Sequence, residues 1–296
     1  MTHSISLAEL CRFFGITRQA YYKHRAVVRE AENQQMAMRE ILAAVHRLRA
    51  RMPRLGARKL LHCLSELEPA LVQGVGRDAF LNLLRDEQLL IRKRKGFRTQ
   101  TTDSRHSFRK YPDLYNHRRS EFTSPLMAIV ADITYIHTLE GFGYAALLTD
   151  VASRMVVGFD VSDSLCVEGS LRAAQMMTGF VEQCAKRGYT APSATIHHSD
   201  RGVQYCSADY ISLLNNHKVL PSMTQNGEPT DNALAERING IFKEEFLLNT
   251  TFPTIKAARE VLRQSVQIYN NERPHLSLNM KTPQQFCDTF FRALGR

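Results

Sequence analysis

Several features that mark whole classes of protein are missing from this 296-residue sequence. It has no tryptophan, and none of its apolar runs reaches the roughly 20 residues that a membrane-spanning helix needs. Its first residues are polar and do not follow the charged and then apolar layout of a secretory signal. The sequence therefore predicts a cytoplasmic protein with no membrane partner.

The cysteine pattern excludes two further classes. Six cysteines are scattered along the chain, and no two of them form a C-x-x-C pair. This spacing fits neither a zinc ribbon nor a disulfide-stabilised scaffold. We expect reduced and mostly buried thiols, as in an intracellular protein.

Acidic residues are scarce in the first part of the chain. Residues 1–120, the basic front, hold 24 Lys and Arg against 11 Asp and Glu. Residues 121–296, the acidic back, hold 15 against 18, so the formal net charge of +10 is concentrated at the front. Such an uneven distribution indicates a polyanion-binding part joined to a part with another task.

The start of the basic front has the pattern of two short helices around a turn. Apolar residues recur at helical spacing over residues 6–24, Gly15 breaks the first helix, and Thr17 can cap the second. This outline predicts a helix-turn-helix domain over residues 1–30, although an ordinary helical hairpin with a basic surface fits equally well. The side chains suited to phosphates and base edges are Arg18, Gln19 and Lys23.

A second helical DNA-binding domain is predicted over residues 31–98. One long helix covers about residues 33–49, Pro53 ends it, and further helices begin near Gly56 and Val75. The DNA contacts expected in this domain are Arg58, Lys59, Arg77, Arg92, Lys93, Arg94 and Lys95. Residues 99–122 are polar and lack periodicity, so they are predicted to be a linker.

From Pro125 onward the pattern changes to short apolar strands. Strands are expected at about residues 126–139, 144–149, 155–161, 194–197 and 218–223, with helices at 165–187 and 207–217. The order three strands, helix, strand, helix, strand predicts an α/β fold, a ribonuclease-H-like core with a five-stranded mixed sheet. We assign this core to residues 123–250 and expect a C-terminal helical extension over residues 251–296.

Three acidic residues of this core are candidate metal ligands. Asp132 stands in the middle of an apolar strand, where an unpaired carboxylate is costly to bury, and Asp200 follows the fourth strand. A helix capped by Asp231 is expected from residue 232 to about 248, with Asn232, Glu236, Asn239 and Lys243 on one face. Any one of these acids alone would more often be a surface charge or a salt-bridge partner. Together they provide the oxygen ligands that Mg²⁺ prefers.

The order and spacing of these residues resemble a known family. Asp200 and Glu236 are separated by 35 residues, and Lys243 follows seven positions later. The motifs that carry the resemblance are Asp132-Ile133-Thr134-Tyr135-Ile136, His198-Ser199-Asp200-Arg201-Gly202, Gln204-Tyr205, Tyr269-Asn270, Arg273-Pro274-His275 and Thr282-Pro283. In these motifs the sequence resembles the second-frame product of insertion-sequence family three transposases, which share the Asp, Asp, Glu signature of retroviral integrases.

The resemblance implies a DDE transposase. Asp132, Asp200 and Glu236 would be catalytic and would bind two Mg²⁺ ions, for which Mn²⁺ would substitute. The enzyme would free a 3′-OH at the end of an insertion sequence and transfer it to another DNA phosphate. The side chains implied to hold DNA near the metals are Arg237 and Lys243, those implied to support the fold are Asn232 and His198, and those implied to be structural or close to DNA are Arg273 and His275.

The implied partners are the terminal inverted repeats of the element and a target DNA, bound by a homo-oligomer of the chain. The product of the element's first reading frame is a further candidate partner, and the bacterial nucleoid is the implied location. One position departs from the family. Ala131 stands directly before the first Asp, where the family often has Trp.

Two other functions are compatible with parts of the sequence. A non-catalytic DNA-binding regulator, or a domesticated remnant of a transposase, would explain the basic front but gives no reason for the three acids. A ribonuclease-H-type nuclease would share the core and the metals without strand transfer. A zinc-binding amino-terminal domain of the integrase type is disfavoured, because no paired His and paired Cys occur at ligand spacing.

Overall fold

The computed structural model describes residues 5–92, 106–225 and 231–293, which divide into two compact units. Unit 1 comprises the residues up to 50 together with 56–90, and unit 2 comprises residues 51–55 and those from 91 onward. None of the described helices is long and apolar enough to cross a membrane.

Unit 1 is helical in its described part. Its helices are α1 (Leu7–Phe13), α2 (Arg18–Arg51), α3 (Ala57–Leu67), α4 (Pro69–Val72) and α5 (Arg77–Asp86). Gly15 follows α1 with a φ of 67°, and the Thr17 hydroxyl accepts a hydrogen bond from the Ala20 amide at 3.1 Å. The predicted helix-breaking glycine and the predicted cap are therefore both confirmed.

Helix α2 differs from the expected layout. The sequence predicts a short helix before residue 24 and a separate long helix from residue 33, but α2 runs unbroken over 34 residues. No Gly or Pro lies between residues 18 and 51, so nothing in the chain stops the helix. The predicted domain boundary at residue 30 falls inside α2. The short α4 was not predicted either.

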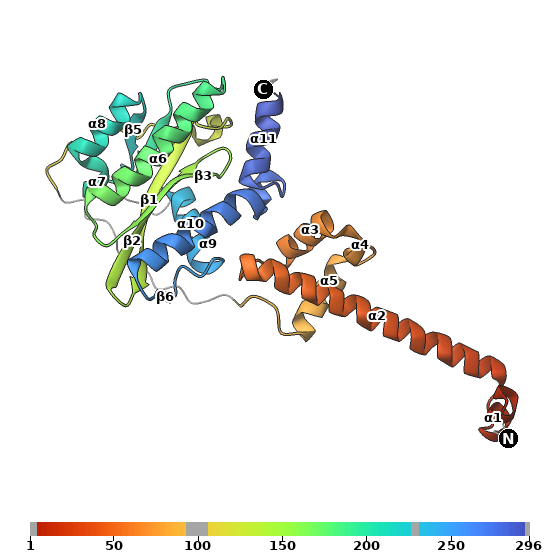
Figure 1. Ribbon diagram of the computed structural model, residues 1–296. Helices are drawn as coiled ribbons and strands as arrows, with labels where there is room; N and C mark the ends of the chain where they lie inside the picture. The colour runs from red at the N-terminus through yellow and green to blue at the C-terminus, as the bar shows by residue number, and fades with distance from the viewer. Residues whose placement is uncertain (1–4, 93–105, 226–230, 294–296) are drawn as a thin grey trace. The chain divides into compact units, whose positions relative to one another are not determined.

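Unit 2 is built on a mixed sheet (Figure 1). Its strands are β1 (Ala128–Thr138), β2 (Gly141–Asp150), β3 (Val156–Ser162), β4 (Ile196–Ser199), β5 (Leu220–Met223) and β6 (Thr251–Phe252). In the order β3-β2-β1-β4-β5, the first three strands are antiparallel, whereas β4 and β5 run parallel to β1. This topology confirms the predicted ribonuclease-H-like α/β core. Only the two-residue β6, which pairs with the far end of β1, was not predicted.

Helices cover both faces of this sheet (Figure 1). Ile129 and Ala131 of β1 face a core formed with α6 (Val167–Lys186), α8 (Ala208–Asn216) and α11 (Pro283–Ala293). Ala128 and Val130 face the opposite side, toward α9 (Ala233–Glu244). The remaining elements are α7 (Val203–Cys206), α10 (Ile255–Glu272) and the 3₁₀ helices η1 (Asn116–Glu121) and η2 (Leu276–Leu278). Since side chains alternate along a strand, Asp132 belongs to the α9 face.

The second half of the predicted linker is packed onto unit 2, and we call residues 106–122 the strap. Tyr115 and Phe122 are buried, and their rings stack with centroids 5.5 Å apart over the α9 face of the sheet. The Leu114 amide donates a hydrogen bond to Ser222 Oγ at 2.8 Å. The strap is therefore part of the core structure.

Candidate active site

Asp132 lies on β1, and the strand register places Asp200 beside it. Within the parallel pair β1 and β4, Val130 is aligned with His198. Asp132 and Asp200 each follow two residues later, so both carboxylates belong to the same face, with Asp132 in the middle of β1 and Asp200 directly after β4. The sequence predicted both positions, and the pairing explains why they meet.

A tight turn holds the Asp200 carboxylate. The Gly202 amide donates a hydrogen bond to Asp200 Oδ1 at 2.9 Å. A Cβ atom on Gly202 would lie 3.0 Å from that same oxygen and 2.9 Å from Gln204 Oε1. The space around Gly202 is tight, so a side chain here would push against the Asp200 and Gln204 side chains, whereas its φ of −61° needs no glycine.

Glu236 is carried by α9, which is fastened to β1 beside Asp132. The Asn232 side chain is buried at the helix start and donates a hydrogen bond to the Ala131 carbonyl at 2.9 Å. Asn232 occupies the N-cap position, which the sequence analysis had given to Asp231, and α9 ends at Glu244, earlier than predicted. The implied role of Asn232 in supporting the helix start agrees with this contact.

Asn239 is a residue of the site to which the sequence analysis gave no role. It lies three positions after Glu236 on α9, and its Nδ2 donates a hydrogen bond to Asp132 Oδ2 at 2.8 Å. The other carboxylate oxygen, Asp132 Oδ1, accepts the Ile133 amide at 2.9 Å. Both oxygens of Asp132 are therefore oriented, one of them by the helix that carries Glu236. Helical spacing from Glu236 was the signal that could have identified Asn239.

The electrostatics of the site favour a bound cation. Burial, followed by the negative charges of Asp200 and Glu236, raises the pKa of Asp132 to about 7, against the hydrogen bonds from Asn239 and Ile133. A carboxylate whose ionised form is disfavoured by two neighbouring acids becomes fully ionised when a divalent cation compensates their charge. The donor set is all oxygen, as Mg²⁺ prefers.

The three acids form an open site. Within the described ranges, no group of three or more His, Cys, Asp or Glu side chains is close enough to enclose a metal ion. Mg²⁺ is commonly bound through one or two carboxylates, with water and substrate phosphate completing its coordination. The residues present therefore fit a metal that is completed by DNA, and an integrase-like core of this type implies a divalent metal.

Lys243 and Arg237 occupy different surroundings on α9. Lys243 is half-buried, and burial lowers the pKa of its ammonium group while the nearby Asp132 opposes this change. Lys243 is therefore within electrostatic range of Asp132. Arg237 is exposed and follows Glu236 directly.

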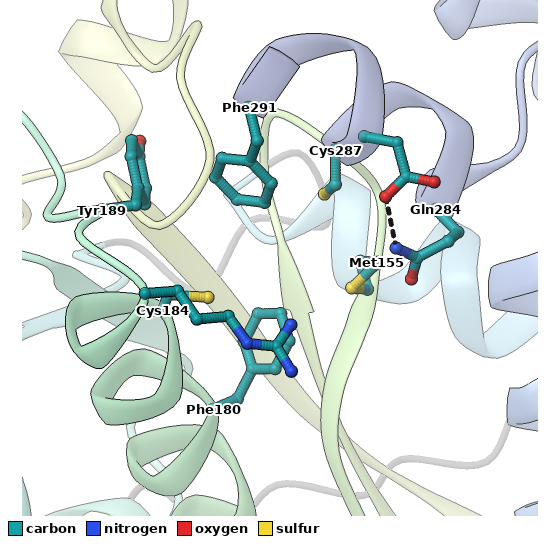
Figure 2. A pocket seen from close by; sticks show the side chains of 9 residues that line it. Met155, Phe180, Cys184, Tyr189, Gln284, Cys287 and Phe291 are labelled. Carbon is teal, nitrogen blue, oxygen red and sulfur yellow. Dashed lines mark hydrogen bonds between the residues drawn. The ribbon is translucent and has the colours of Figure 1, made fainter. Parts of the chain in front are cut away.

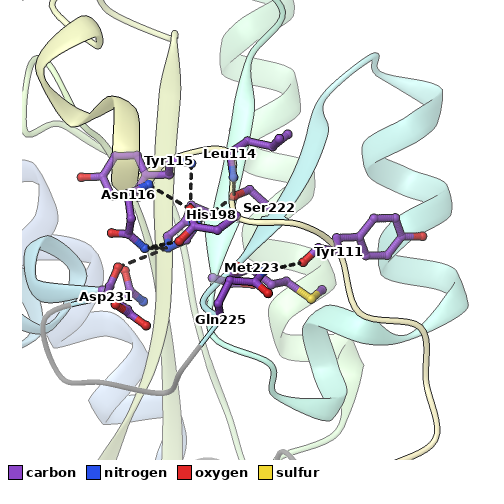
Figure 3. Close-up of polar contacts among 12 residues, drawn as sticks. Tyr111, Leu114, Tyr115, Asn116, His198, Ser222, Met223, Gln225 and Asp231 are labelled. Atoms are coloured by element: carbon purple, nitrogen blue, oxygen red, sulfur yellow. Dashed lines mark hydrogen bonds and ion pairs between the residues drawn. The ribbon is translucent and has the colours of Figure 1, made fainter.

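His198 fixes the elements around the acids (Figure 3). Its ring is fully buried, with Nδ1 at 2.9 Å from Ser222 Oγ and Nε2 at 3.2 Å from the Asp231 carbonyl. Burial lowers the pKa of His198, so the imidazole is neutral. The Ser222 hydroxyl then donates to Nδ1, and Nε2–H donates to Asp231, which joins β4, β5 and the segment before α9. His198 therefore supports the end of β4, as the resemblance implied.

Arg273 is a structural residue of unit 2. Its side chain is 1% exposed, and the guanidinium forms two hydrogen bonds of 2.7 Å with the Glu245 carboxylate. His275 Nε2 lies 2.9 Å from Arg273 Nη1. This buried, fully engaged group connects the end of α10 to the end of α9. Of the two implied roles, structural or close to DNA, the contacts favour the structural one for both residues.

Ala131, the position where the family often has Trp, is fully buried on the side of the sheet opposite to Asp132. It belongs to the same core cluster as Tyr205 and Tyr210. The smaller side chain is thus accommodated in the α6 and α8 core and removes no group from the acidic site.

The predicted DNA contacts of the basic front are mostly on the surface of the chain. The exposed ones are Arg18, Gln19, Lys23, Arg58, Arg77 and Arg92, and Lys59 is half-buried. Arg77 makes an exposed ion pair of 2.8 Å with Asp78. Lys93, Arg94 and Lys95 lie outside the described residues.

A cavity of about 290 Å³ lies away from the acids, between α6 and α11 (Figure 2). Phe180, Cys184 and Tyr189 line it from one side, and Cys287 and Phe291 line it from the other. The cavity therefore has no part in the chemistry of Asp132 and Asp200.

Comparisons with known proteins show which family the chain resembles. Two family models, both described as Integrase core domain, match residues 123–229 and 217–283. The Insertion element IS600 uncharacterized 31 kDa protein of Shigella sonnei is 31% identical over 285 residues, covering 95% of this chain and 98% of that protein. Among solved structures, the catalytic core domain of BIV integrase is 14% identical, covers 58% of this chain and 99% of that one, and has a TM-score of 0.41.

Two relatives are named as transposases. The Transposase for insertion sequence element IS629 of Shigella sonnei is 33% identical over 168 residues, which is 56% of this chain and 53% of that protein. The Transposase InsF for insertion sequence IS3A of Escherichia coli K12 is 33% identical over 169 residues, 55% of this chain and 54% of that protein. The matches span about half the length of these two relatives. From the integrase core and these likenesses, the chain belongs to the transposases of insertion-sequence family three and is a DNA transposase with an integrase-type catalytic core.

Proposed function

We propose that this transposase cleaves a phosphodiester at each end of its insertion sequence and transfers the freed 3′-OH to another DNA phosphate. Asp132, Asp200 and Glu236 are the catalytic residues. The observation that carries the proposal is the shared face of Asp132 and Asp200, with α9 fastened over it by Asn232 and Asn239.

The three acids hold two Mg²⁺ ions in this proposal, and Mn²⁺ substitutes for them. When bound, the ions polarise the scissile phosphate and lower the pKa of the attacking oxygen. The chain's own contribution is orientation: Asn239 fixes the Asp132 carboxylate, and the Gly202 amide fixes that of Asp200. Water and then the 3′-OH are the nucleophiles, so no covalent protein–DNA intermediate forms.

Two groups of side chains, most of them basic, hold the DNA. Arg237 and Lys243 bind phosphates near the acids. The basic front, through Arg18, Gln19, Lys23, Arg58, Lys59, Arg77, Arg92, Lys93, Arg94 and Lys95, binds the terminal inverted repeats. Two ends must meet for joining, so the active form is a homo-oligomer on DNA, with the product of the first reading frame as a further partner. The reaction takes place on the bacterial nucleoid.

The test is a cleavage and joining assay on DNA that carries the element's ends. The wild-type chain and the Asp132→Asn variant are each incubated with this DNA and Mg²⁺ or Mn²⁺. Wild type is expected to give metal-dependent 3′-end cleavage and joined products, and the variant to give neither while still binding the DNA. Equal products from both proteins would refute the catalytic assignment, and binding without cleavage by wild type would favour a regulator.

A further inference from the structure

The strap has two anchor points on the structure next to Asp200. His106 Nε2 lies 2.8 Å from the Arg201 carbonyl, directly after the catalytic acid. Further along, Gln225 Nε2 donates a hydrogen bond to the Tyr111 carbonyl at 3.4 Å. Gln225 Oε1 accepts a hydrogen bond from Arg201 Nη2 at 2.9 Å. Figure 3 shows Tyr111 and Gln225 lying at the end of β5. Residues 107–110 are therefore held between two points beside the Asp200 turn.

The side chains between these anchors are unusual for a linker. Phe108 is 46% exposed, and its ring lies 5.4 Å from that of His106, centroid to centroid. Arg109 and Lys110 follow it and are both exposed, and the Arg109 guanidinium lies 5.2 Å from the centre of the Tyr111 ring. An exposed aromatic ring thus stands beside two surface cations.

These cations have no counter-charge within the described parts of the chain. Neither Arg109, Lys110 nor Arg201 makes an ion pair with a described carboxylate, although Arg118 in the same strap pairs with Glu121 at 2.7 Å. Arg201 Nε is also buried without a hydrogen-bond partner in that part of the structure. Positive charges that make no ion pair with a described carboxylate attract an anion.

We propose that residues 107–110 of the strap, together with Arg201, form a DNA-binding surface that holds an unpaired nucleotide beside the scissile phosphate. Phe108 stacks on the base, and Arg109 and Lys110 bind the adjoining phosphates. The assignment rests on the proposed function, since it is the catalytic acid Asp200 that places the scissile phosphate here. It adds a substrate feature, local separation of the strands at the cleavage point.

Two physical arguments favour an unpaired nucleotide over intact duplex. Phosphate contacts alone require only cations, whereas an exposed ring next to cations is the combination that binds single strands by stacking and charge. Asp132 lies on β1, in the middle of the sheet, and both Asp132 and Asp200 are half-buried. A separated strand reaches such a site with less obstruction than a paired one.

The test compares two DNAs of one sequence, a fully paired end and an end with three unpaired nucleotides, by fluorescence anisotropy without divalent metal. The full chain is used as wild type and as three variants: Phe108→Ala, Phe108→Trp and Arg109→Glu/Lys110→Glu. Phe142→Ala removes another exposed phenyl ring, on β2. Lys186→Glu/Arg187→Glu makes the same charge change at the far end of α6, where both residues are exposed.

Wild type, Phe108→Trp and Phe142→Ala are expected to bind the unpaired end about tenfold more tightly, and Phe108→Ala to lose that preference. The Arg109→Glu/Lys110→Glu variant should lower the slope of log affinity against log salt by about 2 relative to the Lys186→Glu/Arg187→Glu control. No preference in wild type, a preference kept by Phe108→Ala, or equal slopes for the two charge variants would overturn the proposal. Failure of the proposed function is seen separately, as absence of metal-dependent cleavage by wild type.

Discussion

Asp132 shows how much of this site depends on one half-buried carboxylate. Burial and two neighbouring acids raise its pKa, and hydrogen bonds hold both of its oxygens. The hydrogen bonds orient this carboxylate before any metal binds. A bound cation would stabilise its ionised form, which burial and the two neighbouring acids disfavour. The next two predictions follow from these contacts.

Removing the amide that orients Asp132 should slow the chemistry without weakening DNA binding. We expect Asn239→Ala to lower the single-turnover cleavage rate about tenfold or more, because Asp132 Oδ2 loses its donor. Asn271→Ala, an exposed asparagine on α10, is the matched control and should cleave as wild type does. An Asn239→Ala variant with the wild-type rate would show that Asp132 needs no support from α9.

Stability without metal should depend on pH through Asp132. Its pKa is about 7 in the folded chain and near 3.8 in the unfolded chain, so only the unfolded state is ionised between those values. The folded state therefore loses stability as pH rises from about 4 to 7, and the loss is complete above 7. Asp132→Asn lacks this effect and keeps an acceptor for Asn239.

Urea unfolding in EDTA measures this effect. The stability advantage of Asp132→Asn over wild type should grow by about 2 kcal/mol between pH 5.5 and pH 8. Added Mg²⁺ should stabilise wild type more at pH 8 than at pH 5.5, since the metal binds the ionised carboxylate. An advantage that shrinks with rising pH would contradict the assigned sign.

At the scale of elements, the site depends on the register between β1 and β4 and on the hydrogen bond that holds α9 against β1. Pairing of Val130 with His198 brings Asp132 and Asp200 to one face, and Asn232 fastens the start of α9 to the Ala131 carbonyl. The short turn after β4 then aims the Asp200 carboxylate. Elements of four to twelve residues thus set the positions of all three acids.

A methyl group on the Asp200 turn should disturb the site while leaving the fold intact. In Gly202→Ala the new Cβ would lie within 3.0 Å of Asp200 Oδ1, so the carboxylate must move. We expect cleavage to fall about tenfold or more with little change in the melting temperature. Gly179→Ala in α6 has no neighbour within 4 Å and should retain activity, with a gain of about 0.5–1 kcal/mol in stability. Full activity in Gly202→Ala would show that the turn tolerates a side chain.

The sequence was sufficient to predict elements with a strong local pattern. The five main strands and α6 lie within three residues of their predicted ends, because apolar runs and helical stripes are local signals. The strap was predicted as a linker because its two buried aromatic residues, Tyr115 and Phe122, form no periodic apolar pattern. The predicted break in α2 was wrong. The exposed middle of this helix has no apolar stripe, but it also contains no Gly or Pro that would end the helix.

The sequence identified the candidate acids of the site but not the residues that orient them. Spacing and resemblance identified Asp132, Asp200 and Glu236, whereas the Asn239 bond to Asp132 depends on how α9 lies on β1. The space taken by Gly202 and the contacts of His106 are likewise set by packing between distant segments. Such contacts have no local sequence signal.

At the scale of the whole molecule, the uneven charge suggests a division of tasks. The basic front carries 24 cations against 11 acids, and the acidic back carries 15 against 18. The front is proposed to select the DNA, and the back to cut it. Recognition and chemistry should therefore be separable by substitution.

Arg18→Ala/Lys23→Ala should weaken binding to the terminal repeats and leave metal-dependent nicking of random duplex unchanged. Asp132→Asn should abolish metal-dependent nicking and leave binding to the terminal repeats unchanged. The control is Arg29→Ala/Arg39→Ala, which removes the same charge from exposed positions of the same helix. Electrophoretic mobility shifts with terminal and random DNA measure the selectivity. Equal losses from both double variants would mean that the front contributes charge alone.

The central claim is that Asp132, Asp200 and Glu236 act as one metal-dependent unit. The most direct measurement is the single-turnover rate of 3′-end cleavage in Mg²⁺ for wild type, Asp132→Asn, Asp200→Asn, Glu236→Gln and the triple variant. Residues of one unit are strongly non-additive, so each single substitution should lower the rate by roughly 10³-fold or more, and the triple variant should be no slower. Cleavage at the wild-type rate by any single variant would contradict the account.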